Sequence, residues 1–95
     1  MEIEIPVDNN TSVKLNYNPS LQYQYSQAEI LQKVKLDLIL LERMLTIQNL
    51  NLVDKTVLKF LYEKAQNFSD DWKMAFIIFK YTDVYHKKLI PCYVI

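Results

Sequence analysis

The hydrophobic pattern of this chain changes its period once, and this change constrains the fold more than any other feature. In residues 2–17, apolar and polar side chains alternate, with Ile3, Ile5 and Val7 on one face of the first half and Val13 and Leu15 on one face of the second. Such alternation is typical of half-buried strands. From residue 26 onwards the apolar residues recur every three or four positions, which indicates helices. The pattern predicts an α+β fold, in which an N-terminal β-hairpin packs on about three α-helices.

Residues 1–18 are predicted to form the hairpin. Its turn is expected at Asp8-Asn9-Asn10-Thr11, because Asp and Asn side chains hydrogen-bond nearby backbone groups. Pro6 cannot donate a backbone hydrogen bond, so its strand is expected at a sheet edge. Since an isolated hairpin is marginally stable in water, we expect it to pack against the rest of the chain.

Residues 26–88 are predicted to be helical, after a linker over residues 19–25. The first helix is expected from Gln27 to about Gln48, and Ser26 with Glu29 forms a capping box at its start. Its apolar residues fall into two stripes on nearly opposite sides, one with Leu31, Val34, Leu38, Leu41 and Leu45, the other with Leu36, Leu40, Met44 and Ile47. Asp37 is expected on a narrow polar strip between them. A helix with two apolar sides is typically packed between two partners, so this helix is expected either at the centre of the domain or at the seam of a homo-oligomer.

A second helix is expected from about Leu52 to Asn67, with Asp54 on its polar face. The stretch 72–81 is rich in buried-type residues and suits either a strand or a helix. The polar residues of this stretch are separated by seven, three and four positions: Lys73, Lys80, Asp83 and Lys87. This helical spacing favours a helix that ends near Lys88. Ser69, followed by two aspartates, is the expected cap of this third helix.

Residues 89–95 form a tail that is expected to be a strand and to join the hairpin. The tail ends in Cys92-Tyr93-Val94-Ile95, which also fits the pattern of a prenylation signal, so Cys92 is either lipidated or an incidental strand residue. Without lipidation of Cys92, no membrane attachment is expected.

The composition sets further bounds on the class of protein. Ninety-five residues allow one small domain, residues 1–95, and the formal net charge is zero. The chain has no glycine, which excludes a glycine-dependent phosphate loop, and its single cysteine excludes a disulfide scaffold. The start of the sequence has no secretion signal and no apolar run reaches the length of a membrane span, so a cytoplasmic location is expected.

Two groups of residues are candidate interaction sites. Tyrosine is enriched at protein interfaces, and the predicted partner-binding residues are Tyr17, Tyr23, Tyr25, Tyr81 and Tyr85. The second apolar stripe of the first helix is the predicted oligomer interface, with a dimer as the first expectation. We expect no catalytic, metal or cofactor site, because one His and one Cys, His86 and Cys92, give neither a zinc site nor more than a weak nucleophile pair.

These observations favour a small non-enzymatic protein that self-associates and acts as a regulator or inhibitor by occupying the surface of a protein partner. Its size suggests a phage or another mobile element as its source. Two alternatives stay open: an oligomer that binds a nucleotide-like small ligand, and a small DNA-binding regulator resembling a helix-turn-helix. Zero net charge and a single arginine argue against nucleic acid.

Overall fold

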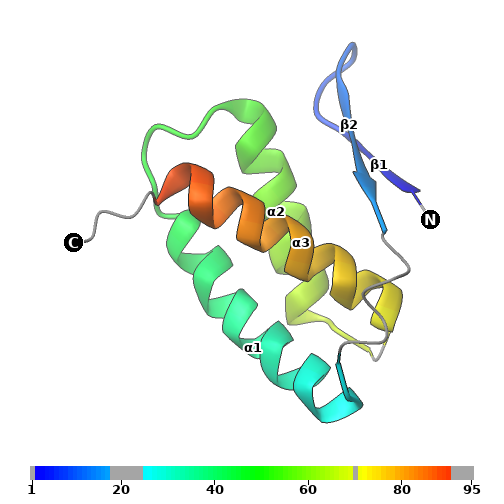
Figure 1. Cartoon of the computed structure of the whole chain (residues 1–95). Helices are drawn as coiled ribbons and strands as arrows, with labels where there is room; N and C mark the ends of the chain where they lie inside the picture. The colour runs from blue at the N-terminus through cyan, green and yellow to red at the C-terminus, as the bar shows by residue number, and fades with distance from the viewer. Residues whose placement is uncertain (1, 18–24, 70, 91–95) are drawn as a thin grey trace.

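A computed structural model describes residues 2–17, 25–69 and 71–90 of the chain. Its elements, in order, are β1 (Glu2–Pro6), β2 (Ser12–Asn16), α1 (Gln27–Met44), α2 (Leu52–Gln66) and α3 (Trp72–Leu89). The predicted α+β fold, a two-stranded antiparallel hairpin followed by three packed helices, is confirmed (Figure 1). Tyr23 of the linker and the tail residues Cys92 and Tyr93 lie outside the described residues, so the expected C-terminal strand has no counterpart among them.

The hairpin forms where the alternating pattern places it. β1 and β2 pair with Ile3 opposite Leu15 and Ile5 opposite Val13. The turn is closed by the Asp8 carboxylate, which accepts a 2.8 Å hydrogen bond from the Asn10 backbone N–H, and this bond lowers the pKa of Asp8. The apolar side chains share one face, as alternation requires. This face packs on the helices, and Ile5 and Leu15 enter the core.

The predicted capping box of α1 is confirmed. The Ser26 hydroxyl accepts a hydrogen bond from the Glu29 backbone N–H, and the Glu29 carboxylate accepts one from the Ser26 backbone N–H, at 3.2 and 3.0 Å. These contacts lower the pKa of Glu29. The helix ends at Met44, four residues before the expected end. The reason is that Thr46 and Ile47 donate to carbonyls three residues back rather than four, so the last turn tightens and closes the helix.

The caps of the other two helices are side chains of Asn51 and Asp71. The Asn51 amide oxygen accepts from the Asp54 backbone N–H at 2.8 Å. The Asp71 carboxylate accepts from the backbone N–H groups of Lys73 and Met74, so α3 begins two residues later than the expected Ser69 cap. Residues 72–81 are helical throughout, which settles the choice between helix and strand in favour of the predicted helix.

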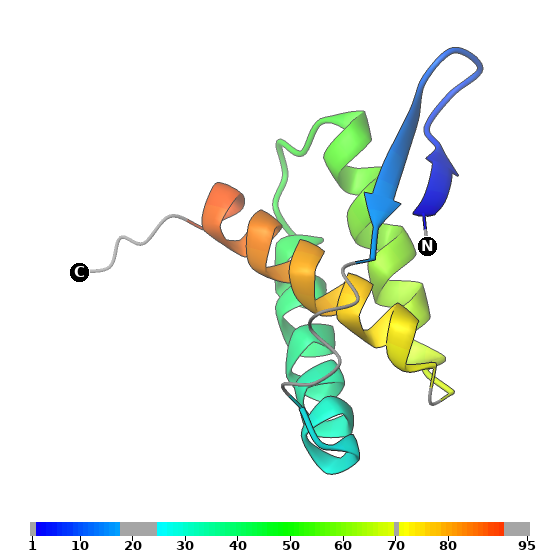
Figure 2. The same ribbon diagram turned by 45° about the vertical axis from the view of Figure 1, so that its right-hand side comes forward.

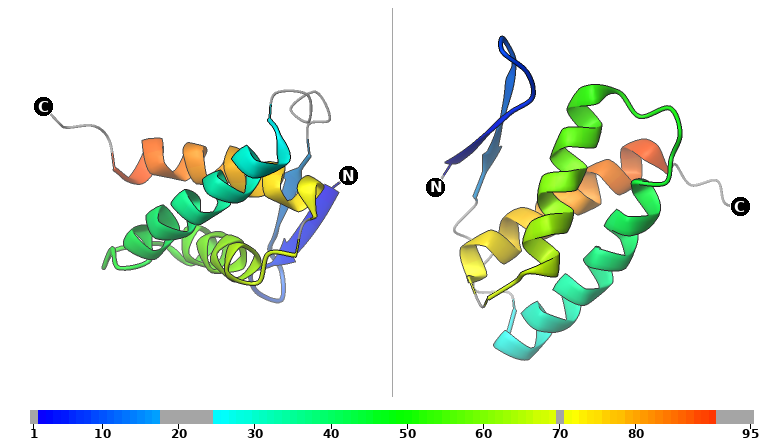
Figure 3. Two further views of the ribbon diagram at one scale, coloured as in Figure 1. Left: turned by 90° about the horizontal axis from the view of Figure 1, so that it is seen from below. Right: turned by 180° about the vertical axis from the view of Figure 1, so that it is seen from behind.

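The three helices pack against one another, and the hairpin stands to one side of them (Figure 2). α3 lies across α1 and α2, and it passes behind both when the molecule is seen from the back (Figure 3). β1 contacts α2 and β2 contacts α3, so the hairpin is attached to the last two helices. The Tyr81 hydroxyl of α3 accepts a 2.8 Å hydrogen bond from the Asn16 backbone N–H at the end of β2. The core is centred on α3, whose residues Ala75 to Phe79 are all buried.

Candidate functional site

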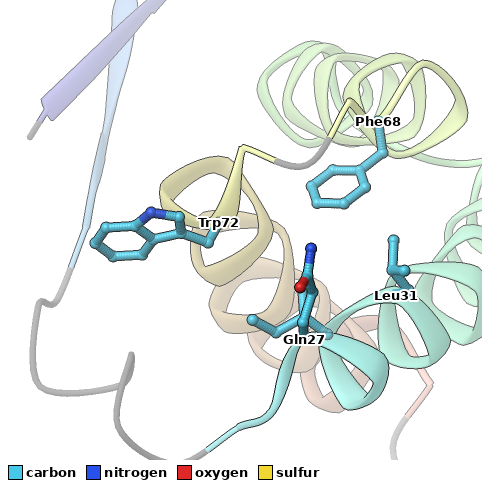
Figure 4. Close-up of a pocket in the computed structure, with 5 residues that line it drawn as sticks. Gln27, Leu31, Phe68 and Trp72 are labelled. Atoms are coloured by element: carbon cyan, nitrogen blue, oxygen red, sulfur yellow. The ribbon is translucent and has the colours of Figure 1, made fainter.

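An apolar groove lies between the N-terminal half of α1 and the segment that joins α2 to α3. One hollow of this groove, about 210 Å³ in volume, is lined by Gln27, Ile30, Leu31, Phe68 and Trp72. Gln27, Leu31 and Phe68 point toward one another across it, whereas the ring of Trp72 turns away at its edge (Figure 4). The hollow is therefore walled by side chains from three separate elements.

A second hollow of about 300 Å³ continues the first along α1 and α2. The two hollows share Leu31 and Phe68, and the second adds Val34, Leu38 and Ala65. We call the two together the Leu31–Phe68 groove. α1 and α2 are in close contact near the loop that joins them, where Leu41 and Met44 are fully buried. At the far end, the small side chain of Ala65 leaves space that no larger group fills.

The groove presents apolar groups to solvent with few polar ones. Leu31 and Trp72 are each 38 % exposed. The polar lining consists of Gln27, Lys35 and Gln66. The lining residues extend along α1 from Gln27 to Leu38. An apolar groove that follows a helix in this way suits the side chains of a helical segment from another protein.

An aromatic cluster supports the edge of the groove. Trp72 meets Tyr17 edge-on, with ring centroids 5.7 Å apart, and Phe76 at 6.0 Å. Tyr25 contacts Phe76 at 5.9 Å and Phe79 at 5.5 Å. Edge-to-face and tilted pairs at these distances are favourable beyond the area that they bury. The cluster fixes Trp72 between the end of the hairpin and the groove.

The predicted partner-binding tyrosines do not form one surface. Tyr17 and Tyr25 are half-buried in the aromatic cluster. Tyr81 holds the hairpin through the hydrogen bond from Asn16. Tyr85 is in the core, where burial, with the nearby Asp54 carboxylate as the second cause, raises its pKa to about 12. Tyr23 lies outside the described residues.

The predicted oligomer interface also divides between surface and core. Leu36 is 55 % exposed, whereas Met44 is fully buried, and Leu40 and Ile47 are half-buried against the core. The reason is that α1 packs on α2 and α3 at once, so the chain's own helices cover most of both stripes. Met44 cannot contribute to an interface between two folded copies. Apart from Leu31 in the groove, the exposed large apolar residues of α1 are Leu36 and Ile39.

Asp37 lies buried in α1 rather than on a polar strip. It is 1 % exposed, and its Oδ2 atom has no hydrogen-bond partner among the described residues. Lys33 lies 3.5 Å from the other carboxylate oxygen and 3.8 Å from Asp83 of α3, with its ammonium group over the ring of Phe79. Burial raises the pKa of Asp37 to about 7, although Lys33 acts in the opposite direction.

Asp54, expected on a polar face, is a second buried carboxylate. It accepts a hydrogen bond from the Asn51 side-chain amide at 3.3 Å and forms an ion pair with Lys88 of α3 at 3.1 Å. The ammonium of Lys88 also lies 5.6 Å from the Tyr85 ring centroid. These contacts join the start of α2 to the end of α3. Their role is structural, and none of these residues lines either hollow of the groove.

The described residues contain no group of three or more His, Cys, Asp and Glu side chains arranged to hold a metal ion. In the same ranges, no helix has the length and apolar character needed to cross a membrane. Comparisons with protein-family models, with curated proteins and with solved structures give no match to this chain. The site therefore has to be judged on its own geometry.

Sequence reasoning missed the groove and both buried carboxylates. Leu31 was assigned to an apolar stripe of the first helix and Trp72 to the start of the stretch 72–81, whereas Phe68 follows the expected end of the second helix. A groove is a gap between helices, and helical periodicity within one segment carries no information about it. The one available signal was Ala65, a small residue in a stripe of large ones.

Proposed function

We propose that this protein is a non-enzymatic protein-interaction module that acts as a regulator or inhibitor by binding a helical segment of a partner. The observation that carries the proposal is the Leu31–Phe68 groove, which leaves Leu31 and Trp72 partly exposed. Partly buried aromatic and aliphatic residues in a concave site are typical anchors of protein interfaces. The groove follows α1 from Gln27 to Leu38, which matches an amphipathic helix that presents apolar side chains every three or four residues.

The polar groups around the groove are placed to contact the polar flank of such a helix. Gln27, Lys35 and Gln66 line the groove beside the apolar residues. They can hydrogen-bond the polar flank of a bound helix, while its apolar side chains contact Leu31, Phe68 and Trp72. A buried centre with a polar rim is the usual organisation of a protein interface.

Self-association is a second part of this proposal, and it uses a different face. Leu36 and Ile39 on α1 are 55 % and 51 % exposed. Neither residue belongs to the Leu31–Phe68 groove. A dimer seam at Leu36 and Ile39 would therefore cover residues other than those that line the groove. The small-ligand alternative is less well supported, because few polar groups line the groove to orient a small molecule.

The test uses a displayed library of helical peptides, selected on the full chain. We expect selected sequences to carry apolar residues at helical spacing and to shift the amide resonances of Leu31 and Phe68 in the protein's NMR spectrum. Leu31→Lys should weaken binding at least about tenfold, because it places a charge in the centre of the groove. Leu52→Lys is the matched control, since Leu52 is 56 % exposed at the start of α2 and lies outside the groove.

Two results would overturn the proposal. One is a selection that enriches no helical peptide. The other is a set of selected peptides that bind the Leu31→Lys variant as tightly as the Leu52→Lys variant. Circular dichroism of both variants checks that each remains folded before binding is compared.

A further inference from the structure

We propose that α3 carries a second interaction surface, which binds an acidic helical segment of a partner protein. This lysine stripe consists of Lys73, Lys80 and Lys87, all exposed. None of the three lysines lines either hollow of the groove, and the two surfaces adjoin where Lys73 lies against Trp72 at the groove's edge. The inference goes beyond the proposed function, and either can fail without the other.

The three lysines fall on one face of α3 at a regular distance. They are seven residues apart, and an α-helix rises 1.5 Å per residue, so successive stripe positions are about 10.5 Å apart along the axis. Seven residues are close to two full turns, and the stripe drifts by only about 20° for each interval. The lysines therefore form a nearly straight row along the helix.

The lysines of this row form no ion pair within the described part of the chain. There the ion-paired lysines are Lys14, Lys33 and Lys88, and no carboxylate lies within 4.0 Å of a stripe lysine. α3 contains four lysines and one aspartate. That aspartate, Asp83, faces Lys33 of α1. Among the described residues, the stripe lysines thus stay unpaired, and Asp83, three residues after Lys80 and four before Lys87, is the one carboxylate that α3 places near them.

Two of the stripe lysines make cation–π contacts with neighbouring aromatic rings of α3. The ammonium of Lys73 lies 5.7 Å from the Trp72 ring centroid, and that of Lys80 lies 5.2 Å from the Tyr81 ring centroid. Cation–π contacts at exposed sites are weak, but they favour conformers in which the charge stays close to the ring. A partner that binds these lysines therefore orders side chains that already have a preferred position.

The shape and chemistry of the stripe favour a helix over other anionic partners. Val84, 49 % exposed, lies between Lys80 and Lys87 and offers an apolar contact that a phosphate backbone does not use. α3 has no arginine, the better residue for phosphates. A lipid surface requires a wide apolar helix face, and this face has one valine. A partner helix with carboxylates seven residues apart repeats at the same distance as the lysines, so each carboxylate meets one ammonium group.

The test compares two peptides of about 20 residues, both helical and of equal composition. One has Glu at three positions seven apart, and the other has the same glutamates four and five apart. Binding to the full chain is measured by fluorescence anisotropy at about 20 and about 200 mM salt. We expect the matched peptide to bind at least about tenfold more tightly than the other, and to bind more weakly at the higher salt concentration.

Two triple variants locate the binding surface. Lys73→Gln, Lys80→Gln and Lys87→Gln together should weaken binding of the matched peptide at least about tenfold. Lys55→Gln, Lys59→Gln and Lys64→Gln together are the control, because they remove the same charge from exposed lysines of α2 that are four and five residues apart. The control should stay within about twofold of the unmodified chain. All six lysines are exposed, and circular dichroism confirms that both variants fold.

Three results would overturn the inference. The first is equal loss of binding in the two triple variants, which would show an effect of net charge alone. The second is equal affinity for the two peptides. The third is a duplex DNA or a phosphatidylserine vesicle that binds the stripe more tightly than the matched peptide does. Leu31→Lys should leave peptide binding to the stripe unchanged, which separates this result from that of the groove.

Discussion

Asp37 offers a quantitative test of how the helices are packed, through the substitution Asp37→Asn. Burial of this carboxyl group raises its pKa from 3.8 to about 7. The folded chain therefore binds a proton more tightly than the unfolded chain does. Between about pH 4 and pH 7, Asp37 is ionised in the unfolded state and protonated in the folded state, so the free energy of unfolding falls as the pH rises. Above about pH 7, the ionised carboxylate of buried Asp37 lowers the free energy of unfolding by its full amount. Below about pH 4, Asp37 is protonated in both states, and this penalty vanishes.

The size of this penalty follows from the pKa. One pKa unit corresponds to about 1.4 kcal/mol, so the rise from 3.8 to about 7 amounts to about 4 kcal/mol. A domain of this size has a total stability of roughly 5–15 kcal/mol. The ionisation of one side chain thus removes a large part of it. Asp37→Asn cannot ionise, and its stability relative to the unmodified chain should increase by up to about 4 kcal/mol between pH 4 and pH 8.

Urea denaturation followed by circular dichroism, at intervals from about pH 4.5 to pH 8.5, measures this difference. The matched control is Asp83→Asn, which removes the exposed carboxylate that faces the same lysine, Lys33. We expect this control to change the free energy of unfolding by less than about 1 kcal/mol at every pH, because exposed ion pairs contribute little. Parallel stability curves for the unmodified chain and Asp37→Asn would refute the reasoning, since they would show that Asp37 is solvated in the folded protein.

Three further predictions concern the hairpin, the start of α3 and self-association. Tyr81→Phe removes the acceptor of the Asn16 backbone N–H. It should lower the free energy of unfolding by about 1 kcal/mol and accelerate hydrogen exchange at the Asn16 amide. Unchanged exchange at this amide would contradict the prediction. Asp71→Ala removes the observed cap of α3 and should lower the free energy of unfolding, measured in urea, by about 1 kcal/mol. Ser69→Ala should change it by less than about 0.5 kcal/mol. Equal effects of the two variants would contradict the observed cap. In sedimentation velocity, Leu36→Lys should yield a smaller species than the unmodified chain, and an unmodified chain that stays monomeric at high concentration would exclude this face as the seam.

The elements of the fold could be predicted because their signals are local. Alternation specified the hairpin, and the Ser26–Glu29 pair specified the start of α1, since each signal lies within a few residues of the structure it forms. The helical stripe of polar residues in α3 was decisive where composition alone was ambiguous. The start of α3 was misplaced by two residues because Ser69 and Asp71 are both good caps.

The candidate site could not be predicted, because it depends on how distant segments meet. Asp37 was predicted on a narrow polar strip of α1, but it is buried there, and its surroundings also include Asp83 of α3. Met44 was assigned to an oligomer interface, whereas the other helices of the same chain cover it. The two-sided pattern of α1 correctly indicated two partners. It could not show whether these partners were other helices of the chain or a second copy.

The attachment of the hairpin has a consequence for the order in which the chain folds. The hairpin precedes the three helices in the chain, so it leaves the ribosome before they do, but its apolar face packs on α2 and α3, and Asn16 bonds to a residue 65 positions later. A short two-stranded ribbon is marginally stable before it has a surface to cover. Contacts between residues so far apart in sequence form late, because the loop between them must close first. The hairpin therefore docks only after α2 and α3 have been synthesised, and until then Ile5 and Leu15 remain open to chaperones or to pairing with another nascent chain.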